Sequence, residues 1–306
     1  MSASESDDSR EGSASDGDCD GALAATLPDL ALLQVFEYVA ADSLDDLVSA
    51  GQVCSHWRRV AASGELWRRR RLRSHGLATL AFTRVVAFAP RLLALDVCWI
   101  NQISPEDRVI RKRALLESRC KLSRLTGVLC HRDADWAHGL LGLHAAHLRE
   151  LEVGTADRDT LRAVGSMRRL RVLRLSGGDP RLGEDPYVFP DPDRSGTYDA
   201  GQGLEQLEVR GLPRDTTVSL LRAHRRTLRK LTLNVGTPGP ADGAAGWPRT
   251  CPDLPQLLQD CKFKNLQELV LTRYAGCYHT VPECSQQRGV VVRILNLHLF
   301  QCSDCS

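Results

Sequence analysis

Aromatic residues, long apolar runs and familiar catalytic motifs are scarce or missing in this chain of 306 residues. Aromatics account for 5% of the sequence, so leucine and valine must build most of any core. No charge-free apolar stretch reaches the roughly 18 residues that a membrane-crossing helix needs. P-loop, GxSxG, HExxH and GxGxxG patterns do not occur. We therefore expect neither an intrinsic catalytic site nor a bound cofactor.

Lysine is also rare, with five copies among 40 basic residues, so arginine supplies most of the positive charge. The net charge of +2 combines −6 over residues 1–22 with +8 over the rest. Because the basic residues form no long stripe with stacking aromatics, we expect neither nucleic acid nor a membrane as a partner. The eleven cysteines have irregular spacings and no signal sequence precedes them, which indicates reduced thiols in the cytoplasm, the nucleus or both.

The character of the sequence changes several times along the chain. Its first part is acidic, polar and without apolar periodicity, which predicts a disordered tail. Helical spacing of apolar residues then gives way to a strand-like repeat. We divide the chain into a tail at 1–22, a helical domain at 24–73, a linker helix region at 74–91, a repeat domain at 92–300 and a C-terminal tail at 301–306.

The helical domain is predicted to hold three helices. The first begins at Pro28, because proline suits the first turn of a helix. After a polar loop, a second helix is expected from about Leu47 to Val60. A third, short helix is expected around Trp67.

A six-residue pattern, apolar-x-x-apolar-x-apolar, recurs through the repeat domain. Four of the seven spacings between copies fall in the 20–29 range that is typical of leucine-rich repeats. The two longest spacings contain inserts at 176–203 and 236–253. Each copy predicts a short strand, with a helix in the segment before it, and such units bury their apolar faces by stacking. The copies begin at Leu92, Leu122, Leu148, Leu170, Leu204, Leu228, Leu266 and Val292, and the second is weak because Gly127 takes its last position.

Three blocks of the helical domain occur in order within 42 residues. Residues 27–39 read LPDLALLQVFEYV, residues 53–61 read VCSHWRRVA, and residues 66–68 read LWR. These blocks resemble the first helix, the V-C-x-x-W-R-x-x-A core and the closing L-W-R element of the F-box family. About three extra residues between Tyr38 and Leu47 predict a lengthened loop. The repeats resemble the leucine-rich repeats that follow F-boxes.

The resemblance implies a fold and a function. The fold would be α/β, with a three-helix F-box followed by an irregular leucine-rich-repeat solenoid of about eight repeats whose parallel strands lie on its concave face. In that family the F-box binds a Skp-type linker protein, which attaches it to a cullin and a RING subunit, while the repeats hold a protein substrate for ubiquitination by proximity. The alternative is a non-catalytic leucine-rich-repeat scaffold that acts outside the ligase.

Two sets of residues follow as candidate binding sites. The helical domain has more apolar surface than about 45 residues can bury alone, so part of that surface is expected to face the linker protein. Strand alternation places a polar row of mixed sign on the concave face, which favours a protein substrate. The predicted linker-binding residues are Leu27, Pro28, Leu32, Val35, Phe36, Val53, Trp57 and Trp67. The predicted substrate-binding residues are Arg124, Glu150, Glu152, Arg174, Glu208, Arg210, Lys230, Asn234 and Glu268.

Other patterns point less clearly to chemistry. Cys302 and Cys305 form a CxxC that could make a zinc site with Cys277, His279 and Cys284, but the spacing of this set is irregular. Residues 191–202 lack the final glutamate of a calcium loop, so we expect no bound metal. His144 and His147 are expected on one helical face beside apolar residues, where they either pack or line a solvated edge. The basic run at 68–73 could be a nuclear localisation signal, a patch for an acidic partner or a nucleic-acid contact, but a solvated face fits it better.

Overall fold

The computed structural model describes residues 27–190, 203–234, 247 and 254–272. The chain divides into two compact units, Met1–Leu66 and Trp67–Ser306. The predicted acidic tail at 1–22, the eighth copy of the repeat pattern and the C-terminal tail lie outside the described residues, as do residues 191–202 of the first insert and all of the second insert except residue 247.

The first unit is helical. It contains α1 (Asp29–Asp42), α2 (Leu44–Ala50) and α3 (Ser55–Ala61), and α4 (Gly64–Trp67) begins at its end. Helix α1 packs against both α2 and α3. The Phe36 ring meets the Trp57 ring edge-on, with centroids 5.3 Å apart. These contacts give the unit a small apolar core, built from Leu32, Phe36, Ala40, Leu47, Val48, Val60 and Ala61.

Two expectations for this unit are wrong. There is no lengthened loop, because Ser43 alone separates α1 from α2. The Ser43 hydroxyl accepts a hydrogen bond from the Asp46 backbone N–H at 3.2 Å and so starts a new helix at once. The single helix expected from Leu47 to Val60 is two helices, because α2 ends at Ala50 and Cys54 takes an extended conformation before α3.

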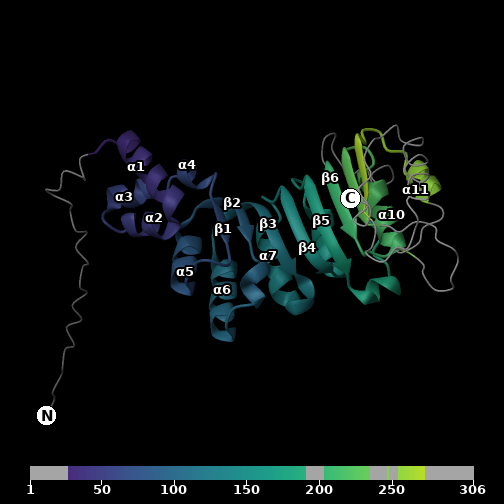
Figure 1. The fold of residues 1–306 in the computed structure, drawn as a ribbon, viewed down its shortest axis with the longest axis horizontal. Helices are drawn as coiled ribbons and strands as arrows, with labels where there is room; N and C mark the ends of the chain where they lie inside the picture. The colour runs from purple at the N-terminus through teal and green to yellow at the C-terminus, as the bar shows by residue number, and fades with distance from the viewer. Residues whose placement is uncertain (1–26, 191–202, 235–246, 248–253, 273–306) are drawn as a thin grey trace, which may run out of the picture. The chain divides into compact units, whose positions relative to one another are not determined.

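The second unit holds a parallel sheet of eight strands in sequence order. Parallel neighbours require a crossover between them, and helices or short 3₁₀ turns supply it. Figure 1 shows the strands side by side with these helices along them. The strands are β1 (Arg71–Arg73), β2 (Arg91–Asp96), β3 (Lys121–Leu129), β4 (Glu150–Ala156), β5 (Val172–Gly178), β6 (Gln206–Arg210), β7 (Lys230–Asn234) and β8 (Glu268–Thr272).

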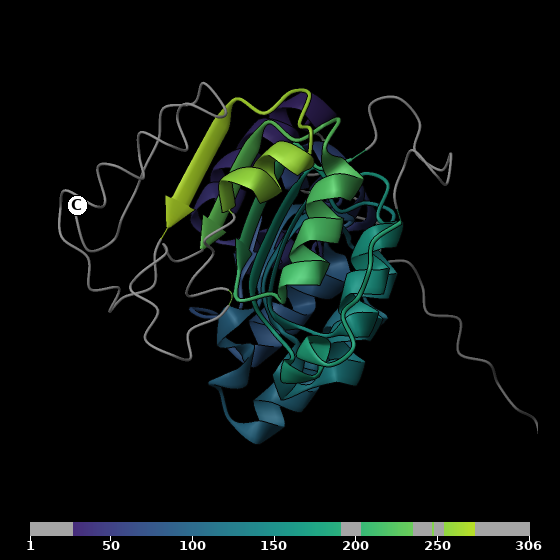
Figure 2. The same cartoon turned by 90° about the vertical axis from the view of Figure 1, so that its right-hand side faces the viewer.

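The helices of this unit cover one face of the sheet, as Figure 2 shows. They are α5 (Thr79–Phe88), α6 (Pro105–Glu117), α7 (Ala134–His144), α8 (Arg158–Ser166), α10 (Arg214–His224) and α11 (Leu254–Asp260). Apolar side chains from both layers fill the space between them, among them Phe82, Leu140, Leu161 and Leu220, which are fully buried. We call the opposite side of the sheet the open face.

The strands β2–β8 coincide with the first seven copies of the repeat pattern. The leucines in the fourth position of these copies pair with one another from strand to strand, so they form one continuous row beneath the sheet. That row reads Leu95, Leu125, Leu151, Leu173, Leu207, Leu231 and Leu269. Strand β1 was not predicted. It extends the row with Leu72 and lies inside the segment assigned to the helical domain.

Gly127 explains why the second copy looks weak. It adopts φ +77°, and the pairing of β3 with β4 shifts register between Leu125 and Val128. Val128 therefore takes the buried place that Gly127 would have had. A Cβ on Gly127 would lie 2.4 Å from the backbone nitrogen of Cys98, so this bulge also requires glycine for space.

Candidate functional site

The open face carries the predicted substrate-binding residues. Side chains alternate between the two sides of a strand, so the residues beside the buried leucines point away from the helices. One row runs Ala94, Arg124, Glu150, Val172, Gln206, Lys230 and Glu268, and the next contains Glu152, Arg174 and Glu208. Asn234 follows in register with Arg210. The structure thus places all nine predicted residues on this face, and the contact with a substrate stays a prediction.

Five of the nine surround one hollow of about 440 Å³ over β5–β8. Its charges are paired. Glu208 accepts from Arg210 at 2.6 Å and lies 3.7 Å from the Arg174 Nε atom, while Lys230 Nζ contacts Glu268 at 2.6 Å. We call this region the compensated hollow, and it is defined by Arg174, Glu208, Arg210, Lys230 and Glu268.

A second hollow, of about 430 Å³, lies at the amino ends of β2–β4. Arg124 and Glu150 from the predicted set border it and pair at 2.6 Å. The rest of its charged lining is positive, and we call it the basic groove. It is defined by Arg68, Arg91, Lys121, Arg124, Arg149 and Arg169, with His147 and Glu150.

Four cations of the basic groove were missed in the sequence: Arg91, Lys121, Arg149 and Arg169. They are exposed, and no carboxylate within the described part of the chain pairs with any of them. A signal was present, because each lies directly beside the first leucine of a repeat copy: Arg91 before Leu92, Lys121 before Leu122, Arg149 after Leu148 and Arg169 before Leu170. Four consecutive copies share this feature.

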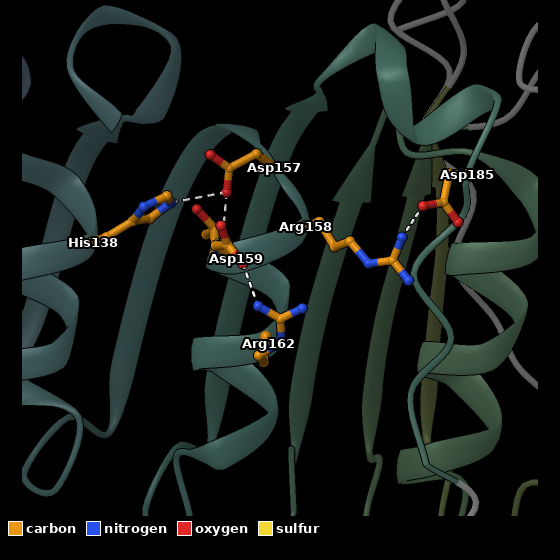
Figure 3. Close-up of polar contacts among 7 residues, drawn as sticks. His138, Asp157, Arg158, Asp159, Arg162 and Asp185 are labelled. Carbon is orange, nitrogen blue, oxygen red and sulfur yellow. Dashed lines mark hydrogen bonds and ion pairs between the residues drawn. The ribbon is translucent and has the colours of Figure 1, made fainter. Parts of the chain in front are cut away.

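The opposite ends of β4 and β5 carry an acidic cluster, drawn in Figure 3. Asp157 caps α8 by accepting the Thr160 backbone N–H at 2.8 Å, and it contacts His138 Nε2 at 3.0 Å. Burial tends to raise the pKa of Asp157, but these hydrogen bonds outweigh burial, so its pKa is lowered. Nearby, Arg158 pairs with Asp185 and Arg162 with Asp159.

This cluster works as a helix cap and a set of ion pairs. Among the described residues, no group of histidine, cysteine, aspartate and glutamate side chains is arranged to hold a metal ion. The residues considered for zinc and calcium lie outside the described part of the chain. No helix among the described residues is long and apolar enough to span a bilayer.

Buried histidines and cysteines recur where a helix returns to the sheet. His144 ends α7, His224 ends α10 and Cys261 follows α11, and all three are buried. The backbone N–H groups of Leu148 and Leu228, which begin the next copies, bond to the His144 and His224 carbonyls. Burial lowers the pKa of both imidazoles to about 4, so both are neutral at pH 7. His144 is thus a packing residue, which was one of the two roles expected for it.

Helix α1 of the first unit is apolar on two sides. At about 100° per residue, Leu32, Phe36 and Ala40 share one side, and these are buried. Leu30, Val35 and Tyr38 fall on the other side, with exposed fractions of 77%, 46% and 81%. A helix that is apolar all round is normally buried all round. The exposed side of α1 is therefore a candidate contact surface.

Asp29 fixes the start of α1 to α3. Its carboxylate accepts from Arg59 at 2.8 Å and 3.1 Å and contacts His56 Nε2 at 2.8 Å. The Arg59 guanidinium, followed by the His56 ring, lowers the pKa of Asp29 by hydrogen bonding. This clamp holds the two helices together without using the exposed apolar side of α1.

Comparison with known families identifies this unit. The F-box-like family model matches residues 24–73. These residues form an F-box-like domain. No curated protein matches the chain.

The F-box-like domain exposes some of the predicted linker-binding residues and buries others. Leu27, Pro28, Val35 and Val53 are exposed, and Trp57 is half-buried against Phe36. Leu32 and Phe36 are buried, so these side chains shape the helices and present no surface.

Trp67 is also buried. It lies in the second unit, where its ring packs 6.1 Å from that of Phe88. Leu30 and Tyr38, which had not been selected, are the most exposed apolar residues of α1. The helical spacing of apolar residues on two sides was the signal that could have identified them.

Proposed function

We propose that the chain is the substrate-recognition subunit of a Skp-cullin-F-box ubiquitin ligase. The F-box-like domain would bind a Skp-type linker protein, and through it a cullin and a RING subunit. The second unit would bind a protein substrate. The chain itself would carry out no chemistry and need no cofactor, since ubiquitin transfer follows from holding a substrate lysine close to a charged conjugating enzyme. Its place of action would be the cytoplasm, the nucleus or both.

The observation that carries this proposal is the exposed apolar side of α1 within a segment that matches the F-box-like family. F-box domains generally bind linker proteins of the Skp type. Leu30, Val35 and Tyr38 offer an apolar strip on one side of the helix, and Val53 adds a further exposed apolar side chain in the turn before α3. Covering such a strip removes apolar surface from water and favours association.

The substrate-binding part of the proposal depends on the second unit as a leucine-rich-repeat solenoid. Three features support this reading: each of seven pattern copies forms one strand of a parallel sheet, the fourth-position leucines pair in one row, and the helices share one face. The open face is left with polar and charged side chains that are available to a protein ligand.

The linker interface can be tested with exposed residues, whose replacement leaves the core intact. We expect Leu30→Asp/Tyr38→Asp to weaken binding of the purified chain to a Skp-type linker protein at least about tenfold, because both substitutions bury a charge in an apolar contact. Isothermal titration calorimetry measures this affinity. The matched control is Leu80→Asp/Val109→Asp, two similarly exposed apolar residues of α5 and α6 in the second unit.

Circular dichroism should show both variants folded. Equal linker binding by both variants would exclude the α1 surface as the interface. If wild-type chain binds the linker but the turnover of its bound proteins in cells does not change when residues 24–73 are deleted, the scaffold alternative is the correct function.

A further inference from the structure

The basic groove and the compensated hollow differ in how their charges are balanced. In the compensated hollow, Glu208 and Glu268 give each of the three cations a carboxylate partner. In the basic groove, Glu150 pairs with Arg124 at 2.6 Å, and Arg91, Lys121, Arg149 and Arg169 have no carboxylate partner among the described residues. These four side chains come from four consecutive repeat copies, and together they bring unbalanced positive charge to one hollow.

This arrangement carries an electrostatic cost. Arg91 and Lys121 are direct partners in the register of β2 and β3. Neighbouring strands lie about 4.8 Å apart, and like charges opposite one another destabilise a sheet. An anion that enters the groove removes this repulsion, so its binding is favoured by each of the unpaired cations at once.

The size and lining of the groove restrict the anion. Three strand spacings, from β2 to β5, cover about 15 Å, which matches about four or five residues of an extended peptide. His147 supplies the one ring among the described lining residues, so bases have no stacking platform there, as single-stranded nucleic acids normally require. Flexible arginine and lysine side chains suit carboxylates along a peptide.

We propose that the basic groove binds an acidic segment of a partner protein, in extended conformation and rich in aspartate or glutamate. This deepens the proposed function by naming a substrate class, and it rests on that function only for the partner's role as a substrate. The Arg124–Glu150 pair lines the groove and adds no net charge to it. In the compensated hollow every cation has a carboxylate partner, so that hollow does not share the site.

The test measures binding of a fluorescein-labelled peptide of alternating glutamate and serine to the full chain by fluorescence anisotropy. Arg91→Glu/Arg149→Glu should weaken binding at least about tenfold, since two attractions become two repulsions. The control Arg132→Glu/Arg222→Glu reverses two exposed arginines outside the groove and changes the net charge equally, so it should stay within about twofold. Lys121→Gln should give a smaller loss without reversing any charge.

The other outcomes distinguish this proposal from its rivals. Equal loss in both double variants would overturn it, because net charge alone would then explain binding. A peptide with glutamine in place of glutamate should not bind. Tighter binding of an oligothymidylate of equal charge would assign the groove to nucleic acid instead. Because the linker protein is absent from this experiment, a failure of the ligase proposal does not affect the result.

Discussion

The two halves of the sheet share one scaffold and differ in the charges that border them. At the amino ends of β2–β4 the basic groove keeps four cations without carboxylate partners among the described residues, while over β5–β8 Glu208 and Glu268 give each neighbouring cation a carboxylate partner. Beneath both halves, the same row of leucines pairs strand to strand. The leucine pattern determines where the strands form, and the residues between the leucines determine what the surface can bind.

Each half also contains one buried histidine, and the effect of pH on stability can test this likeness. His144 lies beneath the first half and His224 beneath the second, each at the end of a helix. Burial, with a smaller effect of His147, lowers the pKa of His144 to about 4, and burial lowers that of His224 to about 4. The Leu204 backbone N–H donates to His224 Nδ1 at 3.3 Å, which requires the neutral ring.

The largest expected effect is therefore a loss of stability in mild acid. In the unfolded chain each of these histidines binds a proton below about pH 6.5. In the folded chain the same histidine binds a proton only below about pH 4. The free energy of unfolding should fall as the pH falls through this window, by about 2 kcal/mol per histidine at pH 5. Urea unfolding at pH 7 and pH 5 measures the difference.

Single substitutions show how much of this pH dependence of stability comes from each half. His144→Asn and His224→Asn should each remove about half of the pH dependence, whatever they do to stability at pH 7. If one variant removes nearly all of it, the interiors of the two halves differ, and the comparison holds only for the leucine row.

The sequence predicts these halves to different extents. Strands β2–β8 follow from a pattern in which every copy except the one for β3 supplies three apolar positions, so local spacing is enough. Strand β1 was missed because Arg71-Leu72-Arg73 has a single apolar residue, and its pairing with β2 decides its conformation. The basic groove was missed because its cations are 20 to 30 residues apart in sequence and meet only through the register of the sheet.

Side-chain contacts over long distances were equally beyond the sequence. Arg111 of α6 is buried and donates to the Ser74 carbonyl at 2.6 Å and to the Leu77 carbonyl at 2.7 Å. Nothing in residues 105–117 indicates that one of several arginines turns inward to hold a segment more than 30 residues earlier. In the F-box-like domain, by contrast, the first helix was predicted from local spacing, but that spacing did not separate exposed Val35 from buried Leu32 and Phe36 among the residues chosen as the contact surface.

A smaller effect is expected from a double substitution that gives the compensated hollow the unpaired cations of the basic groove. Glu208→Gln/Glu268→Gln removes both carboxylates of the compensated hollow and leaves Arg174, Arg210 and Lys230 unbalanced. The glutamate–serine peptide should then bind about fivefold more tightly overall, because a second cationic surface has been created. The free energy of unfolding should change by less than about 1 kcal/mol, since these ion pairs are partly exposed.

The control for this conversion is Glu117→Gln/Glu184→Gln, which makes the same change in net charge at exposed sites outside both hollows. It should raise peptide binding by less than about twofold. Equal gains in the two variants would mean that the pairing of charges within the hollow has no part in excluding acidic peptides.

The smallest expected effect comes from the acidic residues 1–22. Removing them takes the net charge from +2 to +8, because they carry −6. Long-range attraction should then raise the affinity of the basic groove for the acidic peptide about two- to threefold at low ionic strength, and salt should abolish the gain, since exposed charges are screened beyond about 10 Å. Anisotropy titrations at low and high salt measure it. A gain above tenfold that persists in high salt would instead identify residues 1–22 as a competing ligand of the groove.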